Sequence, residues 1–163
     1  LFAEEGLPDG IWYYEDMGFK QRPFMSPDMY RDIIKPAHQK TIAHAHSLRL
    51  PVIMHSCGFI EPLLPDVVDA GIDCLQVIEV KAGMDPLRIA RNFGDRITLF
   101  GGMDARNLVA NDRDAIHAEL AEKIPVLRDT CGYILHSDHS IPTTTEYDTY
   151  RFFVDEGLKL GKF

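Results

Sequence analysis

Two residues with metal-binding side chains lie close together in the segment His55-Ser56-Cys57-Gly58, which follows the apolar run 50–54. Because successive side chains of a strand point to opposite faces, His55 and Cys57 would share one face and could bind one metal ion or one reactant. An imidazole nitrogen and a thiolate sulfur together suit zinc. The same pair would also fit a half-buried strand end with a purely structural thiol, so its interpretation depends on the rest of the chain.

Acidic and imidazole side chains also follow the other apolar runs of the chain. Such side chains can exchange protons with a bound substrate, and each can equally serve as an ordinary loop or helix partner. Glu15 and Asp16 are neighbours, so one of the two should face the site. The candidate catalytic residues are Glu15, Asp16, Glu79, Asp104 and His139, with His136 as a reserve ligand or acid.

The elements that must position these side chains are predicted strands that alternate with predicted helices. Five short apolar runs have the length and residue types of strands, and they cover 10–14, 51–54, 74–78, 97–100 and 133–135. Segments with the apolar spacing of helices separate them, at about 26–48, 60–70 and 85–94, with further helices from 112 and from 143.

Individual residues predict a kink in the first of these helices and the starting point of the last. Pro36 lies inside the first one and should kink it, because proline lacks a backbone donor and crowds the preceding turn. Thr143 and Glu146 have the spacing of a capping box, in which each side chain binds the other residue's backbone N–H. That spacing predicts that the last helix begins there.

Strands that alternate with helices indicate a parallel sheet with right-handed crossovers. A complete eight-unit barrel needs about 250 residues, whereas this chain has 163. The sequence therefore predicts an α/β fold that is the larger part of a TIM (β/α)8 barrel, as one domain over residues 1–163. An open doubly wound sheet is the alternative. The barrel is favoured because every predicted strand ends in residues capable of chemistry, where barrels keep their active sites.

Composition excludes several classes of protein. The formal net charge of −8, without clusters of Lys and Arg, argues against nucleic acid as a partner. No apolar stretch approaches the roughly 18 residues of a membrane span, and the acidic start of the chain is unlike a signal peptide. The expectation is a cytoplasmic protein without a membrane segment. Because the chain lacks an initiator Met, we also expect it to be a piece of a longer one.

Five segments, taken together, carry a family resemblance. They are Met25-Ser26-Pro27-Asp28-Met29-Tyr30, His55-Ser56-Cys57-Gly58, Gly83-Met84-Asp85, Gly101-Gly102-Met103-Asp104 and His136-Ser137-Asp138-His139-Ser140-Ile141-Pro142. In their order and spacing they resemble the uroporphyrinogen decarboxylase superfamily. This superfamily contains tetrapyrrole decarboxylases and corrinoid-dependent (methylcobamide) methyltransferases, all built on a (β/α)8 barrel. The resemblance implies that the chain corresponds to the C-terminal portion, about five βα units, of that barrel.

The methyltransferase branch has a His-x-Cys pair on one strand and a further ligand, commonly Cys, on the last strand. His55 and Cys57 match the pair, and His139 occupies the last-strand position. The resemblance therefore implies zinc bound by His55, Cys57 and His139, with a fourth position free for a substrate. It also implies transfer of a methyl group from methylcobamide, carried by a corrinoid protein, to a thiol or a pterin acceptor.

The decarboxylase branch implies a different chemistry at the same place. Its members use no metal and remove carbon dioxide from a tetrapyrrole. They rely on an Arg and Asp set from the early barrel units, a Tyr, a Ser and a last-strand His that matches His139. Their early barrel units have no counterpart here, and they do not show the pair formed by His55 and Cys57. The pair favours methyl transfer, while decarboxylation and a non-catalytic fragment remain the alternatives.

An incomplete barrel would have two unpaired strand edges. We expect these edges at 11–14 and 133–135, the first and last predicted strands. Unpaired edges recruit partners. The sequence therefore predicts self-association, or coverage of the edges by an N-terminal barrel segment.

Overall fold

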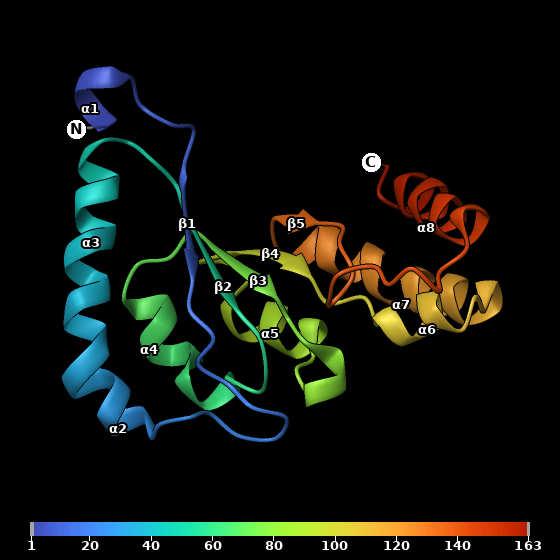
Figure 1. The fold of residues 1–163 in the computed structure, drawn as a ribbon, viewed down its shortest axis with the longest axis horizontal. Helices are drawn as coiled ribbons and strands as arrows, with labels where there is room; N and C mark the ends of the chain where they lie inside the picture. Colours follow the sequence, from blue (N-terminus) through green and yellow to red (C-terminus); the bar gives the residue numbers. More distant parts are fainter. Residues whose placement is uncertain (1, 163) are drawn as a thin grey trace.

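The computed structural model describes residues 2–162 and contains one sheet of five parallel strands. The strands are β1 (Ile11–Tyr14), β2 (Val52–Ser56), β3 (Cys74–Val77), β4 (Thr98–Gly101) and β5 (Tyr133–Ile134). They lie side by side in chain order (Figure 1), so β1 and β5 form the two edges. A doubly wound sheet would reverse its strand order at a switch point. The observed order is that of a barrel wall, and the predicted strands are confirmed.

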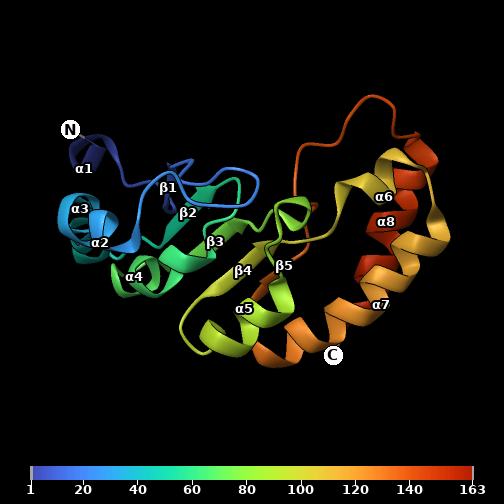
Figure 2. The same ribbon diagram turned by 90° about the horizontal axis from the view of Figure 1, so that it is seen from below.

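Helices connect the strands, and one further helix lies before the first strand and one after the last. They are α1 (Phe2–Glu5), α2 (Pro27–Met29), α3 (Lys35–Ser47), α4 (Leu64–Asp69), α5 (Pro86–Phe93), α6 (Ala105–Val109), α7 (Arg113–Thr130) and α8 (Tyr147–Leu160). Short 3-10 turns cover Glu61–Leu63 and Val80–Ala82. In Figure 2, α4 and α5 lie beneath the strands, and α7 and α8 stand at the β5 end. Within residues 2–162, no helix combines the length and apolarity that a membrane span requires.

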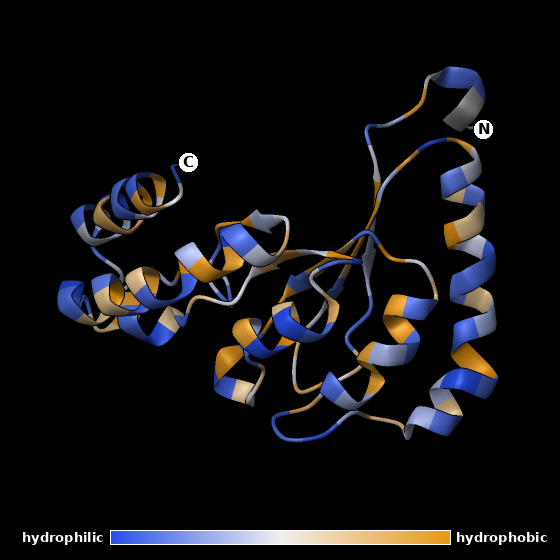
Figure 3. Ribbon diagram, turned by 180° about the vertical axis from the view of Figure 1, so that it is seen from behind, coloured by the Kyte–Doolittle hydropathy of each residue, from blue (hydrophilic) through white to orange (hydrophobic). Residues whose placement is uncertain are grey.

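The two faces of strand β2 differ in burial. In β2, Val52 and Met54 are buried beneath the helices, whereas Ile53 and His55 on the other face are only partly buried. Figure 3 shows the hydrophobic strands beside helices in which hydrophobic and hydrophilic residues alternate. In a closed barrel the second face would line the lumen. Here that inner face is open, and it carries the side chains with catalytic potential.

The helix at 27–47 changes its winding where a kink was expected. Ser26 caps its start by accepting a hydrogen bond from the Met29 backbone N–H at 3.1 Å. A π-helical turn, Tyr30–Ile34, then leads into α3, and the Lys35 N–H bonds the carbonyl of Tyr30. Pro36 lies in the first turn of α3. The missing N–H of proline is thus accommodated by a wider turn just before it.

The predicted capping box at the last helix is wrong. Helix α8 begins at Tyr147, and its N-cap residue Glu146 makes no capping bond with its side chain. Instead the Glu146 backbone N–H donates to Oδ1 of Asn111 at 2.8 Å, and the Asn111 amide donates to the carbonyl of Thr144 at 3.2 Å. A side chain from the turn between α6 and α7 therefore fixes the start of α8, and this long-range contact replaces the local cap.

Candidate metal site at the carboxyl ends of β1 and β2

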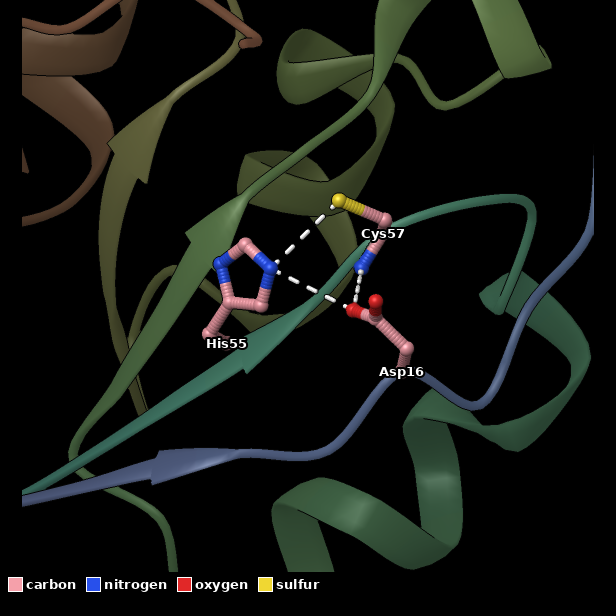
Figure 4. Close-up of side chains that lie close together, drawn as sticks. All are labelled: Asp16, His55 and Cys57. Atoms are coloured by element: carbon pink, nitrogen blue, oxygen red, sulfur yellow. Dashed lines mark hydrogen bonds and ion pairs between the residues drawn. The ribbon is translucent and has the colours of Figure 1, made fainter. Parts of the chain in front are cut away.

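Three potential metal ligands converge at the carboxyl ends of β1 and β2 (Figure 4). Nε2 of His55 lies 3.4 Å from Sγ of Cys57 and 3.3 Å from Oδ1 of Asp16. The three ligand atoms lie within 4.8 Å of one another, and within residues 2–162 no other group of three such side chains does so. The sequence predicted the pairing of His55 with Cys57, and the structure adds Asp16 to it.

Strand register explains why residues 41 positions apart meet. Tyr14 of β1 pairs with His55 of β2, so Asp16 arrives opposite Cys57 when both chains leave the sheet. The Asp16 carboxylate accepts a hydrogen bond from the Cys57 backbone N–H at 3.0 Å. This bond joins the two strand ends and holds the carboxylate beside the imidazole.

The other nitrogen of the His55 ring is also engaged. Nδ1 of His55 contacts Oε1 of Gln76, a buried residue of β3 that pairs directly with His55. Sequence analysis did not single out Gln76. The available signal was its type, because Gln76 has the only amide side chain among the four buried residues of β3.

The cluster opens into a cavity of about 400 Å³ on the inner face of the sheet. Both imidazoles of the last strand end, His136 and His139, line this cavity opposite His55. The Tyr14 ring covers His55, with 5.0 Å between the ring centroids. The remaining lining residues are Trp12, Cys57, Gln76, Val77 and Ser140. His139, the predicted third ligand, thus shares the cavity but is not one of the three converging residues.

The predicted catalytic residue Glu79 supports the turn that follows Cys57. Its Oε2 accepts a hydrogen bond from the Gly58 backbone N–H at 2.6 Å, and its Oε1 lies 3.4 Å from Nζ of Lys81. Gly58 has a φ of +80°, and a β-carbon there would lie 2.3 Å from the carbonyl carbon of Gly18. Glu79 and this close backbone contact together fix where the Cys57 side chain begins.

Asp104 caps a helix in this structure. It accepts a hydrogen bond from the Arg106 backbone N–H at 2.9 Å at the start of α6, and the Arg106 guanidinium binds the same carboxylate. Burial alone would raise the pKa of Asp104, but the hydrogen bonds from Arg106 outweigh it and lower that pKa. Asp104 is not among the residues that line the cavity.

Glu15 and Asp16 leave β1 on opposite faces. Glu15 points toward α3, where its carboxylate lies 3.8 Å from Nε2 of the buried His38, and Tyr30 binds the other nitrogen of that ring at 2.9 Å. Of the two neighbouring carboxylates, Asp16 is therefore the one that faces the site.

Asp138 connects two loops at the mouth of the sheet. Its fully buried carboxylate accepts hydrogen bonds from the backbone N–H groups of Val80 at 3.0 Å and Ala105 at 2.9 Å. Burial raises the pKa of Asp138, although the backbone hydrogen bonds from Ala105 and Lys81 act in the opposite direction. These bonds tie the end of the sheet near β5 to the segments that follow β3 and β4.

The electrostatics of the cluster favour a cation. Burial, followed by the nearby carboxylates of Asp16 and Glu79, raises the pKa of the Cys57 thiol to about 11. At neutral pH the thiol therefore keeps its proton until a cation replaces it. One imidazole nitrogen, one sulfur and one carboxylate oxygen within 4.8 Å form a donor set that zinc accepts. The residues present fit a zinc ion.

Comparison with known proteins gives the wider context. Residues 16–158 match the profile of the uroporphyrinogen decarboxylase (URO-D) family. The chain is 34% identical over 113 residues to a methylcobamide:CoM methyltransferase MtaA of Methanosarcina barkeri, which covers 66% of this chain and 32% of that protein. It is 31% identical over 88 residues to a methylated-thiol--coenzyme M methyltransferase of Methanosarcina mazei, covering 53% of this chain and 22% of the relative.

A solved structure also resembles this fold over nearly the whole length of the present chain. A methyltransferase from Methanosarcina mazei matches 98% of this chain and 44% of its own chain, with a TM-score of 0.73 at 24% sequence identity. This likeness, together with the strand order, shows that the chain has the fold of part of a TIM (β/α)8 barrel. The chain spans less than half the length of each relative.

Proposed function

The chain belongs to the uroporphyrinogen decarboxylase family, and we propose that within it the chain forms part of a zinc-dependent methyltransferase. The methyl group would pass from a corrinoid protein to a thiol or pterin acceptor. The observation that carries this proposal is the convergence of His55, Cys57 and Asp16 at the carboxyl ends of the strands. The similarity to methyltransferases that act on methylcobamide and on methylated thiols supports it.

His55 and Cys57 would be the first two zinc ligands. Asp16 is the third ligand that the geometry favours, because its Oδ1 already lies 3.3 Å from Nε2 of His55. His139, across the cavity, is the competing candidate. Either choice gives three protein ligands and leaves one position for a substrate, as catalytic zinc sites do.

The chemistry at this site would be activation of the acceptor. A bound zinc ion would lower the proton affinity of an acceptor thiol so that a thiolate forms at neutral pH. The imidazoles of His136 and His139 line the same cavity and would take up the released proton. Trp12 and Tyr14 stack with 5.8 Å between ring centroids and would form an apolar wall on which the acceptor rests.

Partners of two kinds follow from this proposal. A corrinoid protein would dock over the mouth of the sheet, where the cavity opens. The edges at β1 and β5 would be covered by a second copy or by an N-terminal barrel segment. Light scattering of the purified chain tests the second copy directly.

Tetrapyrrole decarboxylation is the alternative function. It would use the imidazole of His139 and neighbouring carboxylates without zinc, and it is supported by the family match and by the two imidazoles in the cavity. A third alternative is a chain without turnover of its own. Metal content distinguishes zinc-dependent methyl transfer from decarboxylation. Activity measured on the chain and on a longer version tests whether the chain has turnover of its own.

The deciding experiment measures metal and turnover together. We expect about one zinc per chain in protein prepared without chelator, and loss of that zinc in Cys57→Ser and in His55→Ala. Cys131→Ser, which changes a half-buried thiol outside the site, is the matched control and should retain zinc. Methylcobalamin serves as the methyl donor, and cleavage of its methyl-cobalt bond is followed by absorbance in the presence of a thiol. A zinc-free protein that decarboxylates uroporphyrinogen would contradict the proposal.

A further inference from the structure

We infer that Gln76 is a positioning residue that fixes the tautomer of His55, and thereby makes Nε2 the nitrogen that binds metal. The role toward metal rests on the proposed function, whereas the tautomer itself does not. Gln76 touches neither of the other two converging residues in the described contacts. Gln76 also lines the cavity, but its contact with the cluster is made through the imidazole ring.

The geometry assigns a separate role to each nitrogen of the ring. Nδ1 of His55 contacts the amide oxygen of Gln76, while Nε2 faces Cys57 at 3.4 Å and Asp16 at 3.3 Å. An amide oxygen can only accept a hydrogen bond, so Nδ1 must carry the ring proton. A neutral imidazole has one N–H, and its lone pair then lies on Nε2. That lone pair faces the thiol and the carboxylate with which it would share a metal.

The opposite orientation of the Gln76 amide has a different consequence. Its NH2 group would donate to Nδ1, and the ring proton would then lie on Nε2. In that state the Nε2 proton would point toward Asp16, and no imidazole lone pair would be available to a cation in the cluster. The two orientations therefore predict opposite tautomers, which a direct measurement can distinguish.

Gln76 is held firmly enough to impose this choice. It lies in β3, between β2 and β4, and pairs with His55 on one side and Phe100 on the other. Its side chain is buried, and a buried amide needs a hydrogen-bond partner to offset the loss of water. The ring of His55 supplies that partner. Metal-binding imidazoles commonly donate their second N–H to such an acceptor, which sets ring orientation and metal affinity.

A neutral acceptor also suits the charge of the site. Asp16 and Glu79 already place two carboxylates near Cys57, and both act to raise its pKa. A carboxylate at position 76 would add a third negative charge to the same cavity. The amide fixes the tautomer without adding this charge, so it does not further oppose formation of a thiolate acceptor in the cavity.

Two variants and one control test the inference. Gln76→Leu removes the acceptor at nearly constant volume, Gln76→Glu keeps an acceptor oxygen, and Gln39→Leu makes the same change at an exposed position of α3. The tautomer of His55 is read from nitrogen-15 NMR of the metal-free protein. Zinc affinity is measured by competition with a chelator.

In the wild type we expect the Nδ1–H tautomer of His55. Gln76→Leu should lose this preference and weaken zinc binding by about 10- to 100-fold. Gln76→Glu should restore both, and Gln39→Leu should match the wild type. A wild-type Nε2–H tautomer, or equal zinc affinity in Gln76→Leu and Gln39→Leu, would overturn the inference.

The failure of the proposed function has a separate signature. If the wild type binds no zinc, the zinc-dependent methyltransferase is excluded, but the tautomer in the metal-free protein still decides the role of Gln76. Should Gln76→Leu fail to fold, the wild-type tautomer and the Gln76→Glu variant provide the same decision.

Discussion

The Asp16 carboxylate lies 3.3 Å from Nε2 of His55 and also accepts the backbone N–H of Cys57 at 3.0 Å. One side chain that follows β1 thus contacts both residues of the pair at the end of β2. It occupies the position beside the imidazole that a third metal ligand would need, whereas His139 lies elsewhere in the lining of the cavity.

Zinc affinity should therefore depend on Asp16. We expect Asp16→Asn to weaken zinc binding at least about tenfold, because a neutral amide replaces an anionic ligand while its oxygen can still accept the Cys57 N–H. The measurement is chelator competition, with His139→Ala in parallel. Unchanged affinity in Asp16→Asn, combined with a loss in His139→Ala, would assign the third position to His139.

Zinc binding should also strengthen with rising pH. The pKa of the Cys57 thiol is raised to about 11, so at pH 7 to 9 the free protein carries a thiol proton that must leave when the thiolate binds metal. The apparent affinity should rise about tenfold per pH unit across this range, because one thiol proton leaves for each zinc ion bound. Calorimetry in buffers of different ionisation enthalpy measures the released proton. A pH-independent affinity would show that Cys57 does not bind as a thiolate.

The turn after Cys57 should tolerate no side chain at Gly58. A β-carbon at Gly58 would lie 2.3 Å from the backbone of Gly18, at a φ of +80°. Gly58→Ala should lower the free energy of unfolding by more than about 1 kcal/mol and weaken zinc binding. Gly6→Ala is the matched control, because Gly6 also has a positive φ but no atom lies within 4 Å of its added β-carbon. Thermal unfolding of both variants tests this, and equal effects would mean that the contact with Gly18 is unimportant.

Asp138 should matter for stability. In Asp138→Asn one oxygen acceptor becomes an NH2 group facing the backbone N–H of either Val80 or Ala105. Leaving such a buried donor unsatisfied costs about 1–3 kcal/mol. The control is Asp148→Asn, which removes only an exposed ion pair with Arg151 and should change stability by less than about 1 kcal/mol. Urea denaturation compares the two, and equal midpoints would contradict the bridging role of Asp138.

Some features of this protein follow from local sequence alone. The five strands could be placed because each apolar run is bounded by residues that stop it, and the parallel order follows from helices between strands. The shared face of His55 and Cys57 follows from the alternation of side chains in a strand. Ser26 caps α2 as its type predicts. These features involve interactions over a few residues, which the sequence records directly.

Other features depend on contacts between distant segments. The register of β1 against β2 decides that Asp16, and not Glu15, meets His55, and the register of β2 against β3 brings Gln76 to the same ring. Asn111 fixes the start of α8 in place of the predicted capping box, and Asp138 reaches loops more than 30 residues away. Periodicity indicates which face a side chain takes, but it does not indicate which strand end lies opposite. That choice is made by sheet pairing and helix packing, so only the tertiary structure decides it.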